Sequence, residues 1–174
     1  MGRDKALLEV DGDACIARIT MALAAAGREP IRIAVARPED IESYGAVIDS
    51  EIEVEWVLDA EPHSGPIEVL VEAFEDPLVE SETLQLAPVD VPWVQSGLFV
   101  ALEDALGNSD TLVMPSVGIW NHPLLALVRP EAVLSRLVSG DRRPLHLQFA
   151  EMPHSILLED ASQLRNVNQP EDLE

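Results

Sequence analysis

Asp90 is the residue whose type and place in the sequence most favour chemistry. It follows the apolar run from Leu84 to Pro88 and precedes Pro92. A carboxylate at the end of a central strand lies beside the sheet interior and opens onto a cleft. It could hold a hard divalent cation, which takes oxygen ligands and often only one or two carboxylates. The alternative is a turn acid that caps a helix beginning near Val94.

Lys5 is the only lysine in a chain with ten arginines and 32 acidic residues. It stands just before the apolar run that begins at Ala6. A lysine at this place could neutralise phosphate oxygens as a point charge. The alternative is a solvent-exposed lysine near the start of the chain. The scarcity of lysine leaves the two interpretations evenly balanced.

Two loops contain further candidate groups. Asp59 follows a predicted strand, and Gly65-Pro66 precedes a predicted helix whose first amide groups have no partner within the helix and could bind an anion. Arg142 and Arg143 could clamp an anion from a second loop. Each has an ordinary alternative, because Gly-Pro is common before a helix and a pair of adjacent arginines is equally well explained as solvated.

Asn166 and Asn168 near the C-terminus fit either a ligand contact or an ordinary turn. The four histidines show no spacing typical of a metal site. Cys15 is the only cysteine, which excludes an intramolecular disulfide and favours a buried small hydrophobe.

The formal net charge of −21 argues against a surface that binds a nucleic-acid backbone. Two explanations of the acid excess stay open. One is adaptation to high cytoplasmic salt, where the Debye length falls to about 3 Å at 1 M and self-repulsion weakens. The other is a dedicated basic partner. We favour the first, because acids are spread along the whole chain.

Length and hydrophobicity define the class of protein. No run of about 18 apolar residues predicts a membrane span, and the N-terminus lacks a signal-peptide pattern, so we expect a cytoplasmic protein without membrane contact. The 174 residues, 47% of them hydrophobic, predict one domain over 1–174.

Strand-like and helix-like segments alternate along the chain. Predicted helices cover 14–26, 38–44, 66–74, 94–106 and 130–138, and predicted strands cover 31–36, 53–58, 83–88, 111–114, 122–128, 145–149 and 155–158. This alternation predicts an α/β fold with a mostly parallel sheet. Ligands of such sheets bind beyond the carboxyl ends of the strands. Asp59 and Asp90 follow predicted strands and are therefore expected in the site.

Six segments, taken in order, resemble the successive motifs of one family. They are Gly2–Leu8, Gly65–Ile67, Pro88–Pro92, His122–Val128, Gly140–Arg143 and Asn166–Leu173. Over nearly its whole length the chain resembles the molybdenum cofactor guanylyltransferases, which are MobA-like NTP transferases. The resemblance implies a three-layer, Rossmann-like nucleotidyltransferase fold with a mostly parallel sheet.

The resemblance also implies a reaction and its residues. The phosphate of molybdopterin would attack the α-phosphate of GTP, pyrophosphate would leave, and a guanine dinucleotide cofactor would form. Lys5 and Asp90 would be the catalytic residues. Lys5, Asp59 and Asp90 would bind the nucleotide, and Asp90 would hold Mg²⁺ against the phosphates.

The resemblance further implies that the pterin substrate would be bound by Arg143, Asn166 and Asn168. GTP and molybdopterin would be the small-molecule partners. A molybdoenzyme or a cofactor-delivery protein would be a macromolecular partner, and the chain would be a monomer or a weak homo-oligomer.

Two features depart from the family pattern. Family members place a strand and a Leu-Ala-Gly-Gly loop before the Gly-x-Asp-Lys motif, whereas Met1 here stands just before that motif, so the first strand would be missing. We favour a start assigned too far downstream over a real truncation, which would leave a non-catalytic remnant. Glu68 stands where the family has a small residue, which weakens the expected preference for guanine. A related nucleotidyltransferase that uses CTP or another acceptor therefore stays open.

Overall fold

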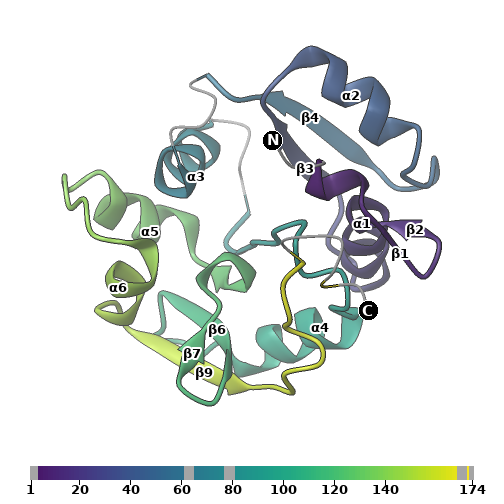
Figure 1. Cartoon of the computed structure of the whole chain (residues 1–174). Coiled ribbons are helices and arrows are strands. Elements are labelled where there is room, and N and C mark those ends of the chain that lie inside the picture. The colour runs from purple at the N-terminus through teal and green to yellow at the C-terminus, as the bar shows by residue number, and fades with distance from the viewer. Residues whose placement is uncertain (1–3, 61–64, 77–80, 168–171, 173–174) are drawn as a thin grey trace. The chain divides into compact units, whose positions relative to one another are not determined.

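A computed structural model describes residues 4–60, 65–76, 81–167 and 172 of the chain. The fold consists of two compact units, which are described separately (Figure 1). The first unit comprises Met1–Asp59, Ala87–Val100 and Glu159–Glu174, and the second comprises Ala60–Leu86 and Ala101–Leu158. Within the described residues, no helix has both the length and the apolar character needed to cross a membrane.

The first unit contains a helix-flanked pair of parallel strands. Its elements are η1 (Lys5–Leu7), β1 (Glu9–Val10), β2 (Asp13–Ala14), α1 (Cys15–Ala25), β3 (Ile31–Val35), α2 (Pro38–Gly45) and β4 (Val54–Leu58). Strands β3 and β4 pair in parallel over their whole length, from Ile31 opposite Val54 to Val35 opposite Leu58. Both predicted strands are therefore confirmed, and their carboxyl ends lie at one edge.

Helix α1 forms because its apolar residues recur at helical spacing. Ile16, Ile19 and Leu23 are all buried. The helix ends at Ala25, and Gly27, whose φ of 73° lies in the left-handed region, follows its C-cap Ala26. The amide of Arg28 then donates to the Leu23 carbonyl at 3.0 Å, which completes a Schellman cap. The predicted helix and its stop signal are thus confirmed.

A hairpin that we did not predict precedes α1. Strands β1 and β2 pair in an antiparallel ladder, joined by Asp11 and Gly12. Both turn residues have positive φ, 53° and 94°, as a two-residue hairpin turn of this kind requires. The Asp-Gly dipeptide was the available signal, but two strands of two residues are too short to show an alternating pattern.

The second unit contains a five-stranded mixed sheet. Its elements are α3 (Pro66–Glu75), β5 (Leu84–Gln85), β6 (Leu112–Val117), β7 (Trp120–Asn121), η2 (Pro123–Leu125), β8 (Leu127–Val128), α5 (Pro130–Leu137), α6 (Leu145–Ala150) and β9 (His154–Leu158). The strand order is β5-β8-β6-β7, with β9 also paired to β6. The β6–β9 pairing is parallel and the shorter pairings are antiparallel. Helix α4 (Ser96–Ala105) runs from the first unit into the second.

Three helices of the second unit share one hydrophobic core with the sheet. Helix α3 contributes Leu70 and Phe74, and β6 contributes Leu112 and Met114. Phe149 of α6 joins the same cluster and has no exposed surface. This core anchors the start of α3 and the loop before α6 to one scaffold, which matters for the pocket described below.

Three predicted strands differ from the structure. The segment 145–149 is the helix α6, because Leu145, Gln148 and Phe149 are buried at helical spacing. A run of five residues is too short to distinguish the alternation of a strand from the spacing of a helix. The segment 122–128 begins as η2 and becomes strand only at Leu127, and the segment 83–88 is strand only at Leu84–Gln85.

Candidate functional site

The structure brings Lys5 and Asp90 together in the first unit. Lys5 Nζ lies 3.6 Å from Asp90 Oδ2. The Lys5 side chain is 41% exposed and that of Asp90 is 25% exposed. A cation and a carboxylate therefore share one solvent-accessible place, although they are far apart in the sequence. A phosphate could reach the ammonium group there, and a metal ion could reach the carboxylate.

Asp4 and Tyr44 hold the segment that presents Lys5. Asp4 caps η1, because its Oδ1 accepts a hydrogen bond from the Ala6 amide at 3.0 Å. Its Oδ2 accepts a second from the Tyr44 hydroxyl at 2.8 Å. Burial, together with this bond to Asp4, raises the pKa of Tyr44 above its ordinary value, so the hydroxyl stays a donor. The backbone at Lys5 is thereby fixed, while its side chain extends to solvent.

The loop that presents Asp90 is held through backbone groups. The Val167 amide donates to the Asp90 carbonyl at 2.7 Å. Arg18 Nε donates to the Pro92 carbonyl at 2.8 Å, and its Nη1 donates to the Val10 carbonyl at 3.3 Å. None of these bonds uses the Asp90 carboxylate, which faces Lys5 instead.

A cation–π contact joins the Asp90 loop to the segment near the C-terminus. The Arg165 guanidinium lies 3.7 Å from the centre of the Trp93 ring. Trp93 packs against a small cluster that includes Cys15 and Val167. Burial raises the pKa of the Cys15 thiol, and the side chain has no exposed surface, which agrees with the prediction of a buried hydrophobe.

Sequence reasoning did not identify Arg18, Trp93 or Arg165 as supports of the site. The spacing of Trp93 to Asp90 was a visible but weak signal. Arg18 gave none, because its partner carbonyl belongs to a residue far along the chain. Such supports depend on the path of the backbone rather than on a local pattern.

Asp90 is the predicted metal ligand of this site. Among residues 4–60, 65–76, 81–167 and 172, no three or more His, Cys, Asp or Glu side chains cluster in a way that could hold a metal ion. Asp90 could supply one carboxylate to a divalent cation, and Mg²⁺ is commonly bound by one or two carboxylates together with substrate phosphates.

The predicted nucleotide-side residue Asp59 and the predicted pterin-side residues Asn166 and Asn168 lie at different places. Asp59 directly follows β4, and its amide donates to the Val35 carbonyl at 3.0 Å, which extends the parallel ladder. Asn166 is exposed beside Val167, the residue bonded to the Asp90 loop. Asn168 lies outside the described residues. The roles of all three stay predictions.

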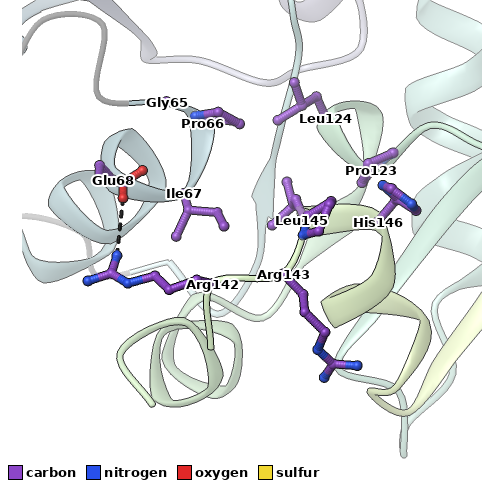
Figure 2. A pocket seen from close by; sticks show the side chains of 11 residues that line it. Gly65, Pro66, Ile67, Glu68, Pro123, Leu124, Arg142, Arg143, Leu145 and His146 are labelled. Atoms are coloured by element: carbon purple, nitrogen blue, oxygen red, sulfur yellow. Dashed lines mark hydrogen bonds and ion pairs between the residues drawn. The ribbon is translucent and has the colours of Figure 1, made fainter. Parts of the chain in front are cut away.

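A pocket of about 550 Å³ lies wholly in the second unit. It is formed by the start of α3, by η2, and by the loop that leads into α6 (Figure 2). Its lining residues are Gly65, Pro66, Ile67, Glu68, Pro123, Leu124, Arg142, Arg143, Pro144, Leu145 and His146. The volume lies in the usual range for small-molecule sites.

Arg143 lines this pocket, but its guanidinium is engaged by two carboxylates. It lies 2.7 Å from Asp141 Oδ2 and 2.6 Å from Glu151 Oε1. The hydrogen bonds from Arg143 lower the pKa of Asp141 to about 2 and also lower the pKa of Glu151. Arg136 bridges the same two acids. The predicted contact of Arg143 with a pterin substrate stays a prediction.

The comparisons with known proteins identify the class. The family model of the MobA-like NTP transferase domain matches residues 1–152, and the chain belongs to that family. It is therefore a nucleotidyltransferase of the MobA-like family, with a nucleotide as its class of substrate. The comparison with curated proteins finds no match.

Solved structures share the fold at low sequence identity. Molybdopterin-guanine dinucleotide biosynthesis protein A from Archaeoglobus fulgidus is 18% identical, with a TM-score of 0.68 over 99% of this chain and 90% of that one. A CMP:2-keto-3-deoxy-manno-octonic acid synthetase complexed with CTP is 15% identical, with a TM-score of 0.76 over 97% and 88%. A Mycobacterium tuberculosis protein in complex with manganese is 16% identical, with a TM-score of 0.72 over 98% and 90%. The expected α/β nucleotidyltransferase fold is thereby confirmed.

Proposed function

We propose that this chain transfers GMP from GTP to molybdopterin, which gives the guanine dinucleotide cofactor and pyrophosphate. The observation that carries the proposal is the Lys5–Asp90 pair, whose charged groups lie 3.6 Å apart, with Lys5 at the start of η1 and Asp90 on a loop held by a backbone bond. The similarity to the Archaeoglobus fulgidus protein over 99% of this chain supports molybdopterin as the acceptor.

The chemistry needs no covalent intermediate with the protein. An oxygen of the acceptor phosphate attacks the α-phosphorus of GTP, and the bond from that phosphorus to the bridging oxygen breaks. Pyrophosphate leaves with the electron pair. Catalysis of such a step rests on positioning and on charge neutralisation. The Lys5 ammonium would neutralise phosphate charge, and Asp59 would bind the nucleotide at the end of β4.

Asp90 would hold Mg²⁺, which supplies charge neutralisation to the nucleotide phosphates when it is bound. The Lys5–Asp90 ion pair is compatible with both roles, because a pair of this exposure contributes only about 0–1 kcal/mol. Arg143, Asn166 and Asn168 would contact the pterin substrate.

Pyrophosphate release tests the proposal. The chain is incubated with Mg²⁺, molybdopterin and one of GTP, CTP, ATP or UTP. We expect release with GTP, and only when molybdopterin is present. Absence of release with every nucleotide would refute catalysis by this chain and favour a non-catalytic member of the family.

Cytidylyl transfer is the second candidate. The structure complexed with CTP has a TM-score of 0.76, against 0.68 for the molybdopterin-guanine protein. The fold alone therefore suits either base. Release with CTP and not with GTP in the same assay would select this candidate.

A further inference from the structure

The pocket of the second unit carries no excess positive charge. Arg142 Nη1 lies 3.3 Å from Glu68 Oε1, so these two charges balance. The Arg143 charge is matched within the network of Asp141, Glu151 and Arg136. Most of the remaining lining is apolar, contributed by Pro66, Ile67, Pro123, Leu124, Pro144 and Leu145. A strongly anionic group such as a triphosphate finds no net attraction there.

The Glu68 carboxylate also disfavours the binding of an anion at the N-terminus of α3. A Cβ added at Gly65 would lie 3.4 Å from Glu68 Oε2, so the carboxylate lies directly beside the first residue of the turn. The positive end of the helix dipole is therefore already neutralised by a carboxylate. A phosphate at this place would meet a like charge, whereas a group with N–H donors would meet an acceptor.

Figure 2 shows Glu68 and Arg142 turned toward each other, while the Arg143 side chain extends in a different direction. The Glu68–Arg142 pair is long, and the two side chains are 40% and 82% exposed, so a ligand can replace it at little expense. A carboxylate and a guanidinium side by side on an apolar wall can accept from two N–H groups and donate to a neighbouring carbonyl.

We propose that this pocket binds a flat heterocycle through the edge that guanine and pterin share. That edge presents an amino group and a ring N–H beside a carbonyl. Glu68 accepts from the amino group and the ring N–H, and Arg142 donates to the carbonyl. The ring itself packs on the apolar lining near Ile67 and Leu124. Glu68 is thus a specificity-determining residue, and the phosphates bind elsewhere.

This inference rests on the proposed function for the identity of the two rings, but its test does not need turnover. Calorimetric titration of the whole chain measures binding of pterin against lumazine, which replaces the amino group by a carbonyl. A second arm compares guanosine with inosine, which lacks the amino group. We expect the amino-bearing ring to bind at least about ten-fold tighter in one arm, because lumazine turns a carbonyl toward the Glu68 carboxylate and inosine offers it one N–H donor fewer. The arm that discriminates tells which ring the pocket takes.

Two variants assign the effect to Glu68. Glu68→Gln should remove the preference, because an amide can accept only one of the two N–H groups. Glu131→Gln is the matched control, since Glu131 is an exposed glutamate in the first turn of α5 in the same unit. The idea is overturned if neither arm discriminates, or if Glu68→Gln keeps the full preference. Ring discrimination without pyrophosphate release would instead contradict the proposed function alone.

Discussion

Replacing Asp90 by asparagine should separate activity from stability. The fold uses the Asp90 backbone, whose carbonyl accepts from the Val167 amide at 2.7 Å, and asparagine retains that bond. The lost interaction is the 3.6 Å ion pair with Lys5, which is 41% exposed. Such a pair contributes about 0–1 kcal/mol, so the free energy of unfolding should fall by less than about 1 kcal/mol.

The effect of Asp90→Asn on turnover should be much larger. Removal of one preorganised charge-stabilising group lowers kcat by about 10²–10³, which corresponds to about 2.7–4 kcal/mol of transition-state stabilisation. Pyrophosphate release gives the rate, and urea unfolding gives the stability of the same preparation. A loss of transition-state stabilisation that exceeds the loss in the free energy of unfolding would show that Asp90 acts in turnover rather than in folding.

Asp11→Asn is the matched control. Asp11 Oδ2 also lies 3.6 Å from an arginine, Arg18, in the same unit, and asparagine tolerates the φ of 53° at this position. Both activity and stability should stay near those of the unchanged chain. Turnover of Asp90→Asn within ten-fold of the unchanged chain would show that Asp90 does not hold the metal. An equal loss in Asp11→Asn would show a general effect of charge.

Three further predictions concern stability. Phe149→Ala, at a fully buried position of the second unit, should lower the free energy of unfolding by about 3–5 kcal/mol in urea, and a loss below 1 kcal/mol would contradict the described core. The pKa of Asp141 is about 2 in the folded chain, below its unfolded value, so the stabilisation from this acid is complete above about pH 4 and is lost as the pH falls toward 2. Unfolding followed by circular dichroism should show this acid-induced loss, and Asp141→Asn should reduce it; an unchanged slope would mean that other acids cause it. With a net charge of −21, the melting temperature should rise from low salt to 1 M KCl, and a flat or falling curve would argue against salt adaptation.

The spacing of apolar residues was sufficient to predict an element wherever it fits only a helix or only a strand. Helix α1 and strands β3 and β4 follow from the spacing of their apolar residues, and Gly27 marks the helix end because few other residues adopt a positive φ. The segment 145–149 shows the limit. Five residues fit both periods, and only burial of Phe149 against the core of the second unit decides for a helix.

Residue types and the order of the motifs were enough to single out the candidate site residues. The single lysine, the acid that follows an apolar strand and the order of the motifs singled out Lys5 and Asp90 and indicated the family. The arrangement of these groups in space came from the tertiary fold. It placed Lys5 beside Asp90, held Arg143 between Asp141 and Glu151, and paired Glu68 with Arg142. Contacts between residues far apart in a chain depend on the path of the whole backbone, and no local period carries that information.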